Sequence, residues 1–136
     1  EQAFVIFRLR PFSTNQRNEL KKLRKIYFVD TGLRNMLINN LNPPELRPDM
    51  GSLWENFVIS ERLKHNENHG KYPNIWFWRN HQQQEVDYLE ETGGALIGWE
   101  IKWGKARFRV PSGFAAAYPK CRVSLINRDN LLDFVG

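Results

Sequence analysis

Acidic side chains are concentrated in the segment 82–103, QQQEVDYLEETGGALIGWEIKW, at a spacing that could bind a cation. The turn TGGA, residues 92–95, has glycines where a two-residue hairpin loop needs positive φ. If the two ends of this turn oppose each other, Asp87 lies opposite Glu100 on the partner strand. This register predicts a single sheet face that carries four charged side chains: Glu85, Asp87, Glu100 and Lys102.

Like charges directly opposite each other destabilise a sheet, so the Asp87/Glu100 pair needs a cation or a proton to relieve it. Hard oxygen ligands of this kind suit Mg²⁺ or Mn²⁺, and Mg²⁺ is usually held by one or two carboxylates plus water and phosphate. Lys102 would then orient an attacking water or a phosphate oxygen. The spacing is equally compatible with a solvated face on which Glu85 pairs with Lys102.

The opposite face of the same hairpin is predicted to be apolar, because side chains alternate along a strand. It would carry Val86, Tyr88, Ile97, Trp99, Ile101 and Trp103. A bulge near Asp87 would shift the pairing by one residue and reverse the faces beyond it.

Around the hairpin, the elements are expected in the order helix, three strands, helix, strand. Apolar residues recur at i and i+4 through 52–66 and predict a helix, with Ser52 as its cap. An aromatic strand follows at 74–80. A short helix is expected between Pro111 and Pro119, and a closing strand at 121–127.

The first third of the chain is predicted to form a long hairpin with strands at 3–10 and 23–30. Asp30 or Thr31 would cap a short helix that ends near Asn40, and the proline-rich stretch 41–51 reads as a linker. These patterns divide the chain into residues 1–47, with the hairpin, short helix and linker, and residues 48–136.

Residues 1–47 carry nine basic and four acidic groups, so they hold the whole net charge of +5. A basic segment of this kind favours contact with nucleic acid, whose phosphates dominate such affinity. A solvated basic loop, or a surface that meets an acidic neighbouring domain, would explain the same charge. The candidate nucleic-acid-binding residues are Lys21, Lys22, Arg24 and Lys25.

The composition indicates a folded domain, with 41% apolar and 13% aromatic residues. There is no apolar run of membrane length and no signal-peptide pattern, and the single cysteine excludes an internal disulfide; together these features predict a cytoplasmic location. Because the chain starts at Glu1 without a methionine, we expect a fragment of a longer protein.

The acidic hairpin resembles the PD-(D/E)XK nuclease motif, in which an aspartate precedes Glu-x-Lys. Here Asp87 is followed by twelve residues and then by Glu100-Ile101-Lys102. The resemblance implies that Asp87 and Glu100 are the metal ligands and Lys102 the catalytic lysine, and it matches Glu55 to the acid of the first helix. Val86 stands where the motif has proline.

Four longer phrases resemble a second, wider pattern: RLRPFSTNQRNELKKLRKIYFVDTGLRN, GSLWENFV, FWRN…EVDY and GWEIKW. They are similar to the C-terminal domain of unknown function that follows the P-loop domain in many bacterial and archaeal AAA-type ATPases. The resemblance implies an α/β fold with a mixed sheet and a restriction-endonuclease-like αβββαβ core. It also implies an N-terminal ATPase domain as partner. This chain has no glycine-rich phosphate loop and hence no ATP site of its own.

Two functions follow from these observations. One is Mg²⁺- or Mn²⁺-dependent hydrolysis of phosphodiester bonds in DNA or RNA, with Asp87, Glu100, Lys102 and Glu55 as the catalytic residues. The other is a non-catalytic module that binds nucleic acid or a protein for the attached ATPase.

Overall fold

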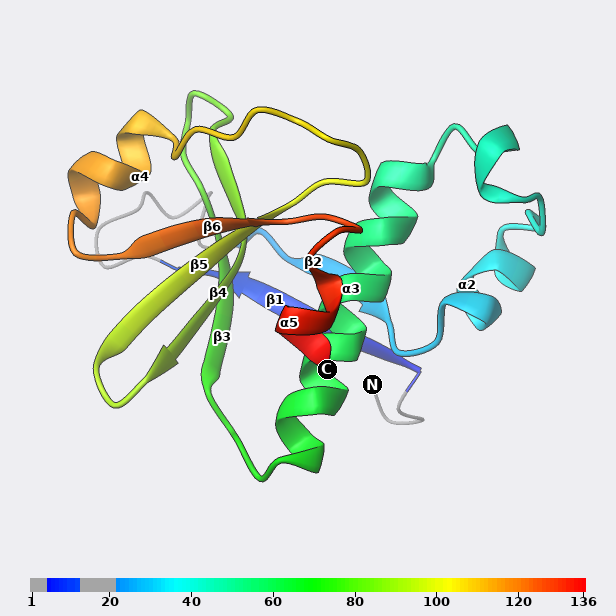
Figure 1. Cartoon of the computed structure of the whole chain (residues 1–136), viewed down its shortest axis with the longest axis horizontal. Coiled ribbons are helices and arrows are strands. Elements are labelled where there is room, and N and C mark those ends of the chain that lie inside the picture. The colour runs from blue at the N-terminus through cyan, green and yellow to red at the C-terminus, as the bar shows by residue number, and fades with distance from the viewer. Residues whose placement is uncertain (1–4, 13–21) are drawn as a thin grey trace.

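The computed structural model describes residues 5–12 and 22–136, and its strands form a mixed sheet in the order β2-β1-β3-β4-β5-β6 (Figure 1). The strands are β1 (Ile6–Pro11), β2 (Lys25–Phe28), β3 (Asn74–Arg79), β4 (Glu85–Thr92), β5 (Ala95–Ile101) and β6 (Arg122–Ile126). The helices are α2 (Thr31–Leu37), the 3₁₀ turn η1 (Pro44–Leu46), α3 (Met50–Asn68), α4 (Ser112–Ala117) and α5 (Leu131–Val135).

The predicted mixed α/β fold class and the order αβββαβ are confirmed by α3, β3, β4, β5, α4 and β6. Strand β1 pairs antiparallel with β2 and parallel with β3, and β5 pairs parallel with β6. The predicted N-terminal hairpin is therefore an integral part of the sheet. The division at residue 47 stays a prediction, and it separates strands of the same sheet.

Helices cover the two faces of the sheet, with α3 and α5 on one side and α4 on the other (Figure 1). The core under α3 contains Val58, Ile59, Phe77, Tyr88 and Phe134, among others. The smaller core under α4 contains Trp78, Val86, Leu89 and Phe114. Two apolar cores thus hold the central strands from both sides.

The residues that precede α2 and α3 decide how each of these helices begins. The carboxylate of Asp30 accepts a hydrogen bond from the backbone N–H of Leu33 at 2.9 Å, which confirms the predicted cap of α2. The predicted cap at Ser52 is wrong, because α3 starts at Met50 and Ser52 lies inside it. Asp49 occupies the cap position, but its carboxylate pairs with Arg34 and Arg47 instead of the helix N–H groups.

The β4–β5 hairpin has the predicted register, from Thr92 opposite Ala95 to Tyr88 opposite Trp99. Gly93 and Gly94 have φ values of 59° and 84°, as a two-residue turn with positive φ requires.

The predicted grouping of Val86 with Tyr88 on one face is wrong, because β4 bulges where it pairs with β3. Trp76 opposes Leu89 but Trp78 opposes Val86, so two residues of β4 face a single residue of β3. The extra residue resets the alternation of side chains. Val86 therefore packs under α4, while Tyr88 packs under α3.

None of the helices in the described parts of the chain combines the length and the apolarity needed to span a membrane.

Gly98 lies where β4, β5 and β6 pack closely against one another. A Cβ atom there would lie 2.8 Å from Leu89 Cδ2 and 3.3 Å from Val123 Cγ2. Since Leu89 is fully buried, its side chain has little room to move. We expect Gly98→Ala to lower the free energy of unfolding by about 1–3 kcal/mol in urea denaturation. The matched control is Gly51→Ala in α3, where an added Cβ meets nothing within 4 Å. This substitution should stabilise the helix by about 0.5–1 kcal/mol.

Candidate functional site

Three carboxylates from distant parts of the sequence meet beside the start of β4. Oxygen atoms of Glu55 on α3 and of Glu85 and Asp87 on β4 all lie within 4.8 Å of one another, an arrangement that could hold a metal ion. We call these three residues the acidic cluster. Lys25 of β2 reaches into it: its Nζ lies 2.8 Å from Glu55 Oε1, contacts Glu85 Oε1 and lies 3.8 Å from Asp87 Oδ1.

Asn56 fixes the position of Glu55 relative to the sheet. Its side chain donates to the carbonyl of Phe28 at 2.7 Å and accepts from the N–H of Phe28 at 2.9 Å. This pair of hydrogen bonds ties α3 to the edge strand β2. Tyr27, two residues after Lys25 on the same strand, donates its hydroxyl to Glu55. Burial and the neighbouring Glu55 raise the pKa of Tyr27, so the hydroxyl stays a donor.

Asp87 lies in the bulge, where the regular β4–β5 pairing has ended. Its Oδ2 accepts a hydrogen bond from the backbone N–H of Ile101 at 2.8 Å. The side chain thereby satisfies a backbone donor near the end of β5. The bulge places Asp87 on the side of α3, next to Lys25 and Glu55, together with Tyr88.

Glu85 pairs with Arg79, which lies directly opposite it on β3, at 2.7 Å between Arg79 Nε and Glu85 Oε2. Its other oxygen contacts Lys25. Of the two readings of this face, the solvated pair between Glu85 and Lys102 is wrong, because Lys102 Nζ pairs with Glu100 Oε1 at 2.8 Å. The long-range partner Lys25 and the opposing Arg79 take its place.

Glu100 lies near the acidic cluster but outside the set of three oxygens. Its Oε1 holds Lys102, whose side chain is 49% exposed. Its Oε2 is buried and lacks a hydrogen-bond partner among the described residues. Within the site, this carboxylate oxygen is thus a buried acceptor that no described residue satisfies.

The electrostatics divide the site into two halves. Burial raises the pKa of Asp87 well above its usual range, and Glu55 and Glu100 raise it further. For Glu85, burial works in the same direction, but Lys25 and Arg79 outweigh it and lower the pKa. Burial would lower the pKa of Lys25, and the surrounding carboxylates outweigh it and raise that pKa. Glu85 and Lys25 are thus a charged pair, whereas Asp87 lacks full compensation.

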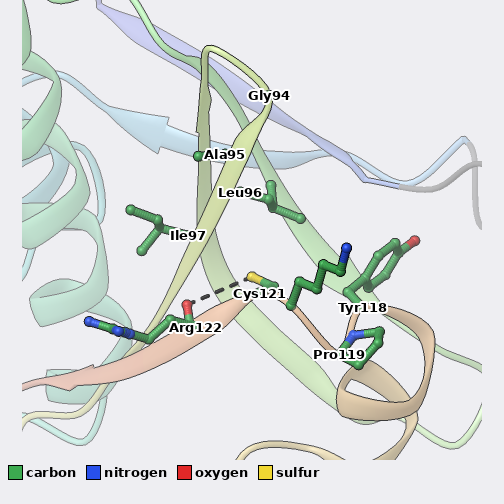
Figure 2. A pocket seen from close by; sticks show the side chains of 9 residues that line it. Gly94, Ala95, Leu96, Ile97, Tyr118, Pro119, Cys121 and Arg122 are labelled. Carbon is green, nitrogen blue, oxygen red and sulfur yellow. Dashed lines mark hydrogen bonds between the residues drawn. The ribbon is translucent and has the colours of Figure 1, made fainter.

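A pocket of about 250 Å³ opens beside Glu55, between β2, α2 and α3. Lys25, Arg34 and Ser52 are among its lining residues, so the cluster is accessible from this side. A second pocket, of about 610 Å³, lies between the β4–β5 turn and the connection from α4 to β6 (Figure 2). Leu96, Tyr118 and Cys121 line it, and it shares no residue with the acidic cluster.

The four candidate nucleic-acid-binding residues have different surroundings. Lys21 lies outside the described residues, and Lys22 and Arg24 are exposed. The side chain of Lys25 is 17% exposed and directed to the carboxylates, so its environment is that of the acidic cluster. Lys25, expected as a nucleic-acid contact, belongs instead to the acidic site, together with Tyr27 and Arg79.

The fold and the site together define a class of protein. It is a mixed α/β domain with an acidic cluster whose negative charge is only partly balanced by neighbouring cations. In comparisons with protein families, residues 50–134 match the family described as Domain of unknown function (DUF4143), and the chain belongs to this family. Residues 1–44 match a second family, Domain of unknown function (DUF8612). The two matches separate between residues 44 and 50, near the division that the sequence analysis places at residue 47.

Two curated relatives are similar to the chain, each 33% identical over 103 residues. They are the Uncharacterized protein Rv2008c of Mycobacterium tuberculosis and the Uncharacterized protein Mb2031c of Mycobacterium bovis. The match covers 74% of this chain but only 22% of each relative, so the chain corresponds to part of a larger protein. No solved structure gives a significant match.

We expect Asp87→Asn to stabilise the metal-free protein at neutral and higher pH, by an amount on the order of 1 kcal/mol. Because the pKa of Asp87 is raised in the folded state, its contribution to stability is present at low pH and is lost as the pH rises through that raised pKa. Asparagine removes the charge and can still accept from the N–H of Ile101.

Urea denaturation between pH 5 and 8 in the presence of a chelator measures this effect. The wild type should lose stability relative to Asp87→Asn as the pH rises. Asp129→Asn, at an exposed carboxylate, is the matched control and should follow the wild type. Parallel curves for the wild type and Asp87→Asn would show that Asp87 is not strained by its surroundings.

Proposed function

We propose that this domain is a nuclease-like module in which Asp87 and Glu100 hold Mg²⁺ or Mn²⁺ for hydrolysis of phosphodiester bonds in DNA or RNA. The observation that carries the proposal is the unpartnered, buried Oε2 of Glu100 beside an aspartate whose pKa Glu100 itself raises. A buried carboxylate oxygen without a donor is costly. A divalent cation would relieve both the missing partner and the repulsion.

A buried acid elsewhere in the same sheet shows what a purely structural carboxylate looks like here. Glu90 accepts from Arg62 at 2.8 and 2.9 Å, from Asn66 at 2.8 Å and from Tyr88 at 2.9 Å. Its charge is compensated on every side. The contrast between Glu90 and Glu100 supports a ligand-binding role for Glu100.

The donor set fits a hard divalent ion, because Asp87 and Glu100 supply carboxylate oxygens only. When bound, such an ion polarises the phosphate and lowers the pKa of a water molecule. Lys102, held by Glu100 and half-exposed, would orient that water or a phosphate oxygen. Glu55 belongs to the acidic cluster, where it holds Lys25 and helps to set the charge around the site.

The partner we propose is an N-terminal ATPase domain of the same polypeptide. The chain spans 22% of the length of its curated relatives, which leaves room for such a domain. The resemblance of the four sequence phrases to domains behind a P-loop domain supports this arrangement. The ATPase would supply movement or loading, while this domain would supply the contact with nucleic acid.

A non-catalytic protein-binding module is the second candidate, and one observation favours it. Several large apolar side chains are exposed on α2, on the loop that follows it and on η1, at Met36, Leu37, Ile38, Leu41 and Leu46. Concentrated apolar side chains on a surface are typical of interaction sites. Under this reading the acidic cluster is a structural network, and divalent ions should leave the melting temperature unchanged.

Mg²⁺ or Mn²⁺ should support cleavage of single- or double-stranded nucleic acid, and Asp87→Ala or Lys102→Ala should reduce the rate by at least about 100-fold. The assay needs the full-length polypeptide with its proposed ATPase domain, labelled DNA and RNA, and a chelator series. Lys105→Ala, at a lysine whose side chain is 86% exposed, is the matched control and should retain the wild-type rate. Absence of cleavage with every divalent ion, together with an unchanged melting temperature, would leave the binding module.

Binding of nucleic acid, measured separately from cleavage, should depend on the exposed cations before β2. Charge reversal by Lys22→Glu and Arg24→Glu should weaken affinity and flatten its salt dependence by about 0.9 in slope per lost phosphate contact on duplex DNA. Fluorescence anisotropy over a range of salt concentrations gives both values. Lys120→Glu, on the α4–β6 connection at the second pocket, serves as control, and an equal effect there would assign the charge dependence to the protein as a whole.

A further inference from the structure

Lys25 Nζ already occupies the point at which the acidic cluster could hold a metal ion. The cluster is defined by oxygens of Glu55, Glu85 and Asp87 within 4.8 Å of one another. The ammonium contacts two of these carboxylates directly and lies 3.8 Å from the third. A compact, strongly hydrated point charge of this kind satisfies carboxylate oxygens much as a small cation does.

The surroundings hold the ammonium in place. Lys25 belongs to β2, and β2 is tied to α3 by the two hydrogen bonds of Asn56. The Nζ atom also lies 5.4 Å from the centre of the Phe77 ring, which closes the site from the core side. An ion that entered the cluster would have to displace a largely buried ammonium that two carboxylates contact directly.

Charge counting leads to the same conclusion. Lys25 and Arg79 together balance Glu55 and Glu85, so this half of the site carries no net charge. Asp87 and Glu100 remain, with Lys102 as the cation on their side. One divalent ion would offset the remaining negative charge of this half of the site. A second ion would leave the same half with a large positive charge.

We propose that Lys25 takes the place of a second metal ion, so that the domain binds a single divalent cation at Asp87 and Glu100. Lys25 is then a positioning residue, which orders Glu55 and Glu85 by its charge. The single bound ion rests on the proposed function, whereas the occupation of the acidic cluster by Lys25 does not. Removal of the ammonium should open the cluster to an ion.

The test is the number of Mn²⁺ ions bound per chain, measured by calorimetry and by electron paramagnetic resonance of free Mn²⁺. The wild type should bind one ion and Lys25→Met should bind two. Lys25→Arg keeps the positive charge and should bind one. Lys22→Met, at an exposed lysine three residues earlier, is the matched control and should also bind one.

Thermal stability gives a second readout, independent of activity. In a chelator, Lys25→Met should melt well below the wild type, because Glu55 and Glu85 face each other without their shared cation. Saturating Mn²⁺ should raise the melting temperature of Lys25→Met by more than it raises that of the wild type. If Lys25→Met does not fold without metal, Lys25→Gln, which keeps a hydrogen-bond donor and removes the charge, replaces it in both measurements.

The possible ion counts separate the two proposals. No ion in the wild type and one in Lys25→Met would support the role of Lys25 and overturn the metal site at Asp87 and Glu100. One ion in both proteins would keep that site and overturn the role of Lys25. Two ions in the wild type would likewise overturn the role of Lys25, and no ion in either protein would overturn both proposals.

Discussion

The ion pairs of Lys25 hold the acidic cluster of this domain together. Glu55 and Glu85 come from a helix and a strand that are thirty residues apart, and each would be buried next to another acid without a shared cation. The cation comes from β2, in the N-terminal third of the chain. Because truncation of one partner in a buried charge pair leaves an uncompensated charge, the N-terminal hairpin and the αβββαβ core depend on each other. This dependence crosses the junction between the two family matches at residues 44–50.

The bulge in β4 is the second constraint, and it explains why the acids lie beside a core instead of on a free face. A regular strand would direct Asp87 away from Tyr88. With the extra residue, both side chains point to α3, so Asp87 reaches Lys25 while Tyr88 remains fully buried. The carboxylate then binds the N–H of Ile101. A local irregularity thereby combines a packed core with a charged site.

Much of the fold could be predicted because its signals are local. The glycines of the 92–95 turn define the hairpin register, and the apolar spacing of 52–66 defines α3. The sequence allowed for a bulge near Asp87 but could not establish it, since it arises from the pairing of β4 with β3, which the hairpin turn does not specify. The short helix α5 has only five residues and gave no periodic pattern.

The site was predictable in part for the same reason. Glu85 and Asp87 of the acidic cluster lie on one strand of the hairpin, and their spacing alone indicated them; the roles of Asp87, Glu100 and Lys102 at a metal site stay a prediction. Lys25 and its partner Glu85 are sixty residues apart, so no local pattern joins them. One signal was present: Lys25 and the aromatic Tyr27 share a face of β2, and a lysine on a buried face requires an acidic partner. Lys25 also lies in a basic run with Lys21, Lys22 and Arg24, and that run instead indicated an exposed patch.

The arrangement also limits where a nucleic-acid strand would have to lie. Lys22 is three residues before Lys25, so the two Cα atoms are at most about 11 Å apart. Under the proposed function, a nucleic-acid backbone held by Lys22 and Arg24 would therefore lie near Lys25 and the acidic cluster that Lys25 contacts. Since the Glu55 and Glu85 half of the site is neutralised by Lys25 and Arg79, the negative charge that would repel this backbone is confined to the half where a divalent ion would cancel it.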